Sequence, residues 1–84
     1  RRQEAERAAE AVMGALIAAA RLNEPCPTNL RLAEIAKLPS PEHASKIVCA
    51  LRDEGRIDVQ FNDHVGRVVT IRASGLSTRA LRAV

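Results

Sequence analysis

Residues 28–55 read TNLRLAEIAKLPSPEHASKIVCALRDEG. A short helical pattern leads into Lys37-Leu38-Pro39, and a longer amphipathic pattern comes after it. Ser40 is a favourable N-cap for the longer pattern, because its hydroxyl can accept a bond from an N–H of the first turn. Pro41 suits the first helical position, and Gly55 suits the left-handed residue just past a helix. The segment therefore predicts two helices joined by a tight turn.

The longer of these helices has one apolar face and one polar face. Its apolar residues recur at i, i+3, i+4 and i+7, namely at Ala44, Ile47, Val48 and Leu51. The opposite face carries Glu42, Ser45, Lys46, Cys49 and Asp53. The shorter helix contributes Leu30, Leu32, Ala33 and Ala36, and its alanines suit a close approach of two helices.

The flanking segments complete a mainly α fold with a small β-hairpin. Helical spacing from Gln3 to Leu22 gives a buried stripe of Ala5, Ala8, Ala9, Val12, Met13, Leu16, Ile17 and Ala20. After Gly55, apolar residues alternate at Ile57, Val59 and Phe61, and again at Val69 and Ile71. The turn composition of residues 62–66 joins these two strands. We expect three helices and a two-stranded hairpin in one domain, residues 1–73, followed by a basic tail, residues 74–84.

The charge is distributed unevenly over the 84 residues. The net charge is +3, yet residues 1–54 contain eight basic and eight acidic side chains. The surplus lies in residues 55–84, where four arginines and no acid come after His64. A one-sided basic region is typical of a polyanion-binding surface. A solvated tail is the alternative interpretation.

Several classes of protein are disfavoured by what the sequence lacks. No apolar run approaches a membrane span, and no signal peptide is visible, so a cytoplasmic protein is expected. Cys26, Cys49, His43 and His64 lack the spacing of a zinc site, so we expect no metal or other cofactor. The chain shows no nucleophile–base pair, no paired carboxylates and no phosphate-binding glycine loop. We therefore do not expect an enzyme.

The order of these elements resembles the winged helix-turn-helix domain of bacterial and phage transcription regulators. It is most similar to the N-terminal DNA-binding domain of LexA-type repressors. The resemblance covers about residues 3–72 and is carried by Pro27-Thr28, Ala33, Ser40-Pro41, Ala44, Leu51, Gly55 and Ile57. Lys37 stands where the family turn usually has glycine, so the turn is either strained or differently shaped. Nothing in the chain resembles the self-cleaving domain of these repressors.

The resemblance implies sequence-specific binding of double-stranded DNA. The helix over residues 41–54 would enter the major groove, and the wing, residues 62–67, would lie on the backbone. Positions that match Glu42, Ser45 and Lys46 face the bases in this family, and the helical period independently places all three outside. Lys46 suits guanine O6 and N7, Glu42 suits cytosine N4, and Ser45 suits several base edges.

Backbone contacts are expected around these base-reading positions. Thr28, Asn29 and Arg31 begin a helix whose free N–H groups and dipole favour anions. Ser40 and His43 flank the reading face, and His64 and Arg67 belong to the hairpin tip with Asn62. Arg72 and Arg79 extend the basic strip, where a homodimer contact is the alternative to DNA.

Two other functions remain open from the sequence. A winged helix can serve protein–protein interaction, using the apolar and alanine-rich faces around Cys49 and Ala50. It can also bind structured RNA or an unusual duplex. The sequence does not distinguish an activator from a repressor, and it does not supply the operator.

Overall fold

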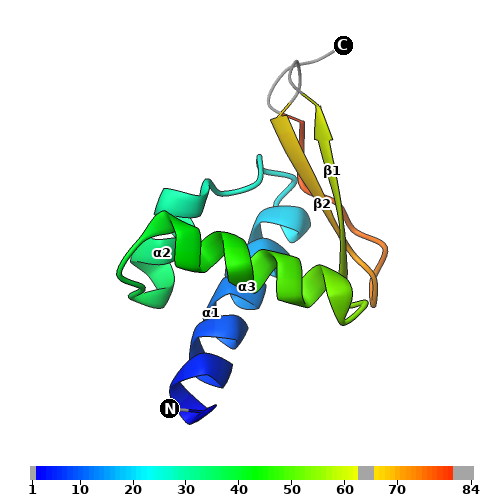
Figure 1. Ribbon diagram of the computed structural model, residues 1–84. Coiled ribbons are helices and arrows are strands. Elements are labelled where there is room, and N and C mark those ends of the chain that lie inside the picture. Colours follow the sequence, from blue (N-terminus) through cyan, green and yellow to red (C-terminus); the bar gives the residue numbers. More distant parts are fainter. Residues whose placement is uncertain (1, 63–65, 81–84) are drawn as a thin grey trace.

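The computed structural model describes residues 2–62 and 66–80, which form three helices followed by an antiparallel hairpin (Figure 1). The helices are α1 (Arg2–Arg21), α2 (Asn29–Ala36) and α3 (Pro41–Asp53). The strands are β1 (Ile57–Asn62) and β2 (Gly66–Ile71). In Figure 1, α3 crosses in front of α1, α2 lies beside the start of α3, and the hairpin rises from its end. The expected order of elements is confirmed.

All three helices end in the same way, with a residue in the left-handed region. Asn23, Lys37 and Gly55 have φ values of 54°, 57° and 77°. The N–H of the next residue then donates to a carbonyl in the last turn of the helix: Glu24 to Ala19, Leu38 to Ala33 and Arg56 to Leu51, at 2.8, 2.8 and 3.0 Å. These bonds define Schellman motifs, which satisfy the last carbonyls of each helix and fix the direction of the outgoing chain.

The turn at Lys37 is strained and keeps the usual shape, which decides between the two alternatives for this position. Its φ and ψ of 57° and 45° are left-handed, so the turn keeps the shape that a glycine would adopt. A side chain in this region costs about 1–2 kcal/mol. The next residue, Leu38, is partly buried against the core, and this packing holds the strained turn.

The two expected N-caps differ. The Thr28 hydroxyl accepts a hydrogen bond from the Arg31 N–H at 3.1 Å, so the cap of α2 is confirmed. Ser40 has the extended backbone of an N-cap, but its side chain makes no cap bond. Its hydroxyl instead lies 2.7 Å from Nδ1 of His43, which corrects the capping role expected for Ser40.

An aliphatic core joins the three helices to the base of the hairpin. Its fully enclosed members are Val12, Leu16, Leu32, Ala44, Leu51, Ile57 and Val69. The predicted stripes of α1 and α3 supply most of this core, although the side chain of Ala5 lies outside the described side chains. Leu30 and Phe61 belong to the apolar patterns of the shorter helix and the hairpin, but both are exposed. Leu30 points away because it lies about 200° around the helix from Leu32. Phe61 lies near the outer end of the hairpin, away from the core.

Residues 74–80 belong to the folded unit, so the boundary expected at residue 73 must move. The segment returns along β2, where the Ile71 N–H donates to the Leu76 carbonyl at 2.7 Å and Thr78 pairs with Val69. Thr78 is buried, and its hydroxyl accepts the Val69 N–H at 2.9 Å. Arg79 then donates its N–H to the Glu24 carbonyl at 2.8 Å. Residues 81–84 lie outside the described residues.

Replacing Lys37 with glycine should stabilise the protein. Relief of the left-handed strain is worth about 1–2 kcal/mol, and the greater freedom of glycine in the unfolded chain offsets part of it. We expect a net gain of a few tenths to about 1 kcal/mol in urea unfolding. Lys46→Gly is the matched control, because the same change inside the right-handed helix α3 should cost about 1 kcal/mol. A less stable Lys37→Gly protein would contradict the left-handed turn.

Replacing Thr78 with valine should destabilise the protein, although the two side chains have nearly the same shape. The Val69 N–H would lose its acceptor in a buried position, at a cost of about 1–3 kcal/mol. Thr78→Ser retains the acceptor and loses one methyl group, worth about 0.8 kcal/mol. Amide exchange distinguishes the variants, because Val69 should exchange faster in Thr78→Val and remain protected in Thr78→Ser. If Thr78→Val were as stable as the wild type, residues 74–80 would not contribute to the folded unit.

Candidate nucleic-acid interface

The outer face of α3 presents the three side chains predicted to read bases. Burial of the apolar stripe fixes the rotation of the helix, so the residues between its members must face outward. Glu42 and Lys46 are exposed, and Ser45 is half-buried. Together with Cys49, also exposed, they lie at i, i+3, i+4 and i+7 and form one polar strip along α3. The predicted outward placement agrees with the exposure of Glu42 and Lys46, Ser45 is only partly exposed, and base contact stays a prediction.

The N-terminal end of α3 is flanked by the Ser40–His43 pair. The hydrogen bond between the hydroxyl and Nδ1 orients an exposed imidazole and leaves Nε2 directed to other partners. Both side chains were expected at the DNA backbone. Because the two side chains are hydrogen-bonded to each other, a phosphate at this end of α3 would contact both together.

The start of α2 supplies a second polar end beside α3. The Thr28 hydroxyl caps the Arg31 N–H, which leaves the first two N–H groups of the helix without intrahelical acceptors. Arg31 is exposed on the first turn. Asn29 is half-buried, and its side-chain oxygen accepts a hydrogen bond from Arg67. Of the three residues predicted to contact phosphate here, Asn29 is thus partly engaged within the protein.

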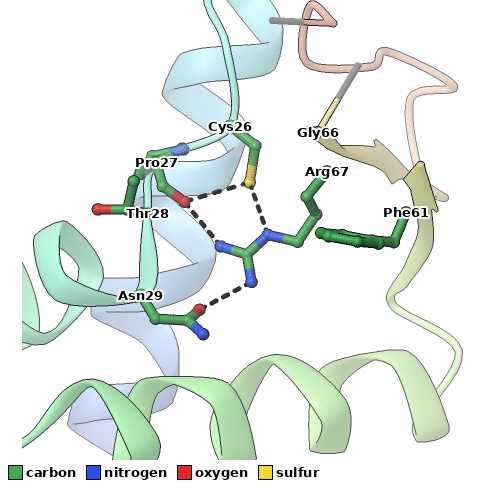
Figure 2. Close-up of a pocket in the computed structure, with 7 residues that line it drawn as sticks. All are labelled: Cys26, Pro27, Thr28, Asn29, Phe61, Gly66 and Arg67. Carbon is green, nitrogen blue, oxygen red and sulfur yellow. Dashed lines mark hydrogen bonds between the residues drawn. The ribbon is translucent and has the colours of Figure 1, made fainter. Parts of the chain in front are cut away.

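Arg67 lies in a different setting from the one expected. Its guanidinium turns away from the hairpin tip toward the segment before α2 (Figure 2). Nη1 donates to Asn29 Oδ1 and Nη2 to the Pro27 carbonyl, both at 2.7 Å, while Nε lies 3.3 Å from Cys26 Sγ. Three of the five N–H donors of the side chain are therefore used inside the protein.

A shallow groove runs beside Arg67, between the hairpin and the start of α2. It has a volume of about 390 Å³, and the exposed ring of Phe61 forms one wall (Figure 2). Cys26 lies on the opposite wall, where burial raises the pKa of its thiol and the Arg67 charge partly opposes that rise. The thiol is therefore protonated at neutral pH, and it donates weakly to the Pro27 carbonyl at 3.4 Å.

The basic strip predicted along residues 55–84 is interrupted in space. Arg67 lies near the outer end of β2 and Arg72 just beyond its inner end, about 17 Å away at 3.4 Å per residue. Arg72 pairs with Asp58 at 3.4 Å, and Arg56 pairs with Glu10 at 2.8 Å. The Arg56 contact lowers the pKa of the Glu10 carboxyl. His64 lies outside the described residues, as does the side chain of Asn62.

Sequence reasoning missed Cys26 and Phe61 as parts of one site. Alternation assigned Phe61 to the apolar face of the hairpin, and no pattern marks Cys26 between its two prolines. The cross-strand pairing of Phe61 with Arg67 brings ring and guanidinium together. Only the strand register reveals that neighbourhood, and the register was not predicted.

Within residues 2–62 and 66–80, no group of three His, Cys, Asp or Glu side chains is arranged to hold a metal ion. None of the helices described in this part of the chain is long and apolar enough to cross a membrane. Comparison of the chain with models of protein families, with curated proteins and with solved structures finds no match.

Proposed function

We propose that this chain is a winged helix-turn-helix domain that binds double-stranded DNA sequence-specifically as a transcription regulator. The observation that carries the proposal is the arrangement of α3. Its apolar stripe is buried against the other helices, while Glu42 and Lys46 face outward on a helix with no described element across its outer face in Figure 1. An α-helix is about 10–12 Å wide with its side chains, which fits a major groove about 12 Å wide.

The roles of the individual residues derive from this placement. Lys46 lies about one and a half turns into α3 and would donate to guanine O6 and N7. Ser45 adds an adaptable hydroxyl, and Glu42 would accept from cytosine N4. The start of α2, with Thr28 and Arg31, would meet a phosphate, while the hairpin as the wing lies along the adjacent backbone. The domain acts by binding and needs no catalytic group or cofactor for this role.

A second candidate function is supported by one observation. Leu22, Leu30 and Phe61 are large apolar side chains that are exposed by 69%, 60% and 73%. A protein partner that covered these side chains would remove their apolar surface from water, which would favour a protein–protein interface. In that case α3 would not contact DNA, and the domain would show no preferred duplex sequence.

Lys46→Ala should change which DNA sequences are chosen. Its removal should cost about 1–3 kcal/mol on the preferred site and much less on random DNA. Selection from a randomised duplex pool, run on both proteins, makes this comparison. Lys37→Gly is the control, since it removes the only other lysine, which lies at the turn, and should leave the selected motif unchanged.

The selection also decides between the two candidate functions. The same motif with the same discrimination from Lys46→Ala and the wild type would remove Lys46 from the reading set. No motif from any of the proteins would overturn DNA reading and favour the protein-interaction interface.

The thiol of Cys49 should report the same contact. It is exposed on the polar strip, one turn beyond Ser45, so a maleimide should modify it readily in the free protein. In a major groove it would be covered, and a saturating preferred duplex should slow its modification by about tenfold or more, the effect of about 1.4 kcal/mol of protection. Peptide mass spectrometry measures Cys49 separately from Cys26. The control is the same duplex at a salt concentration that releases the protein. An unchanged rate with bound duplex would place α3 outside the groove.

A further inference from the structure

The outer half of the hairpin is held to the helices by Arg67. Within the described residues, the hydrogen bonds from β1 and β2 to the segment before α2 and to the first residue of α2 all come from this one side chain. At the base of the hairpin, Ile57, Val69 and Ile71 are buried in the core. At its outer half, Phe61 is exposed, so core packing does not fix the direction of that end. The inner half of β2 is also supported by the returning C-terminal segment, through the bonds of Thr78 to Val69 and of Arg79 to Glu24. The outer half of the hairpin lies beyond these bonds, and a two-stranded hairpin alone is at best marginally stable, so the Arg67 contacts matter there.

The acceptors around Arg67 suit a rigid, planar donor group. A sulfur, a side-chain amide oxygen and a main-chain carbonyl each receive one bond from a different nitrogen of the guanidinium. A lysine ammonium at this position is a point charge on a flexible stem and cannot reproduce the fork. Among the described residues no carboxylate takes part, so these three contacts hold the positive charge of Arg67 in place without neutralising it.

The contacts join the two backbone-binding elements of the proposed interface. Pro27 and Asn29 lie on either side of Thr28, the cap of α2, and Arg67 lies on β2 one residue from the start of the strand. Any movement of the hairpin away from α2 must break the two 2.7 Å bonds. The groove between hairpin and helix, with Phe61 as one wall, is lined by Arg67 and by the partners of those bonds.

We infer that Arg67 is a positioning residue for duplex binding. It sets the angle of the hairpin against the N-terminal end of α2, so that both elements reach one stretch of DNA backbone at the same time. This inference rests on the proposed function. It differs from a direct phosphate contact, in which Arg67 would act through its charge.

Two substitutions separate positioning from a charge contact. Arg67→Lys keeps the charge and loses the fork, and Arg67→Met loses both. For a positioning residue, both variants should bind the preferred duplex about tenfold or more weakly, with the same dependence of log K on log salt as the wild type. For a phosphate contact, Arg67→Lys should bind like the wild type and Arg67→Met should flatten the slope by about 0.9.

Arg56→Lys is the matched control just before the hairpin. Within the part of the chain that the structure describes, the Arg56 side chain makes one bond, from Nη1 to Glu10 at 2.8 Å, and a lysine can keep that ion pair. This variant should bind the preferred duplex within about twofold of the wild type. Circular dichroism at the binding temperature confirms that each variant is folded. A folded Arg67→Lys protein with a lower melting temperature and undiminished affinity would show a role in stability alone and overturn the inference.

A measurement without DNA tests the same contacts. In nitrogen-15 NMR spectra of the free protein, the Arg67 Nε–H should exchange slowly with water, because it is bonded to Cys26. The heteronuclear NOE of the Phe61 and Gly66 amides should fall in Arg67→Lys and stay unchanged in Arg56→Lys. Equal NOE values in Arg67→Lys and the wild type would overturn the inference. If the wild type binds no duplex, the proposed function fails, and the NMR comparison alone decides whether Arg67 positions the hairpin.

Discussion

Burial of the α3 stripe is the constraint on which the rest of the structure depends. Ala44, Val48 and Leu51 are almost fully enclosed, and α3 packs against both other helices and β1. A rotation of the helix by one residue, which is about 100°, would turn the apolar stripe toward water and bring charged side chains into the core. The apolar face therefore determines where the polar face points. The positions of Glu42 and Lys46 are consequences of packing, whatever those side chains do at the surface.

The helix ends carry this arrangement from one element to the next. Each helix stops at a left-handed residue, a conformation that glycine adopts freely, asparagine tolerates and lysine adopts at a cost. At Asn23 and Lys37 the conformation suits the residues that follow, because Leu38 packs against the core and Glu24 accepts a bond from the Arg79 N–H. Pro25 in turn pairs with Arg79, so the end of α1 also anchors the returning C-terminal segment. The conformational preference of the residue and the packing of the fold thus agree at Gly55 and conflict at Lys37.

The parts of the fold that sequence could predict are those set by local pattern. Helical periodicity located Val12, Leu16 and Leu51 in the core, and the Ser40-Pro41 and Gly55 signals bounded α3, because each depends on a few neighbouring residues. Arg67 and Thr78 could not be placed in this way. Their partners are 38–41 and 9 residues away in the chain, so their surroundings are set by strand register and by the path of the loop before α2. A count of arginines predicted a basic strip, but only the contacts show that several of these charges are already engaged.

The distribution of engaged charges bears on how this surface could recognise DNA. On α3, Glu42 opposes Lys46 in charge, and beyond α3 the guanidinium groups of Arg56 and Arg72 are paired with carboxylates. Those pairs weaken the attraction of phosphates from a distance. Non-specific affinity for DNA depends on counterion release by cationic side chains, so we expect it to be low on this surface. Recognition would then rest on shape: a helix turned by its core, a helix end capped by Thr28, and a hairpin set at a defined angle. A rigid framework loses little conformational entropy on binding, which compensates for weak attraction between charges. In such a protein a side chain that fixes geometry, as the three bonds of Arg67 do, has more influence on binding than its charge alone.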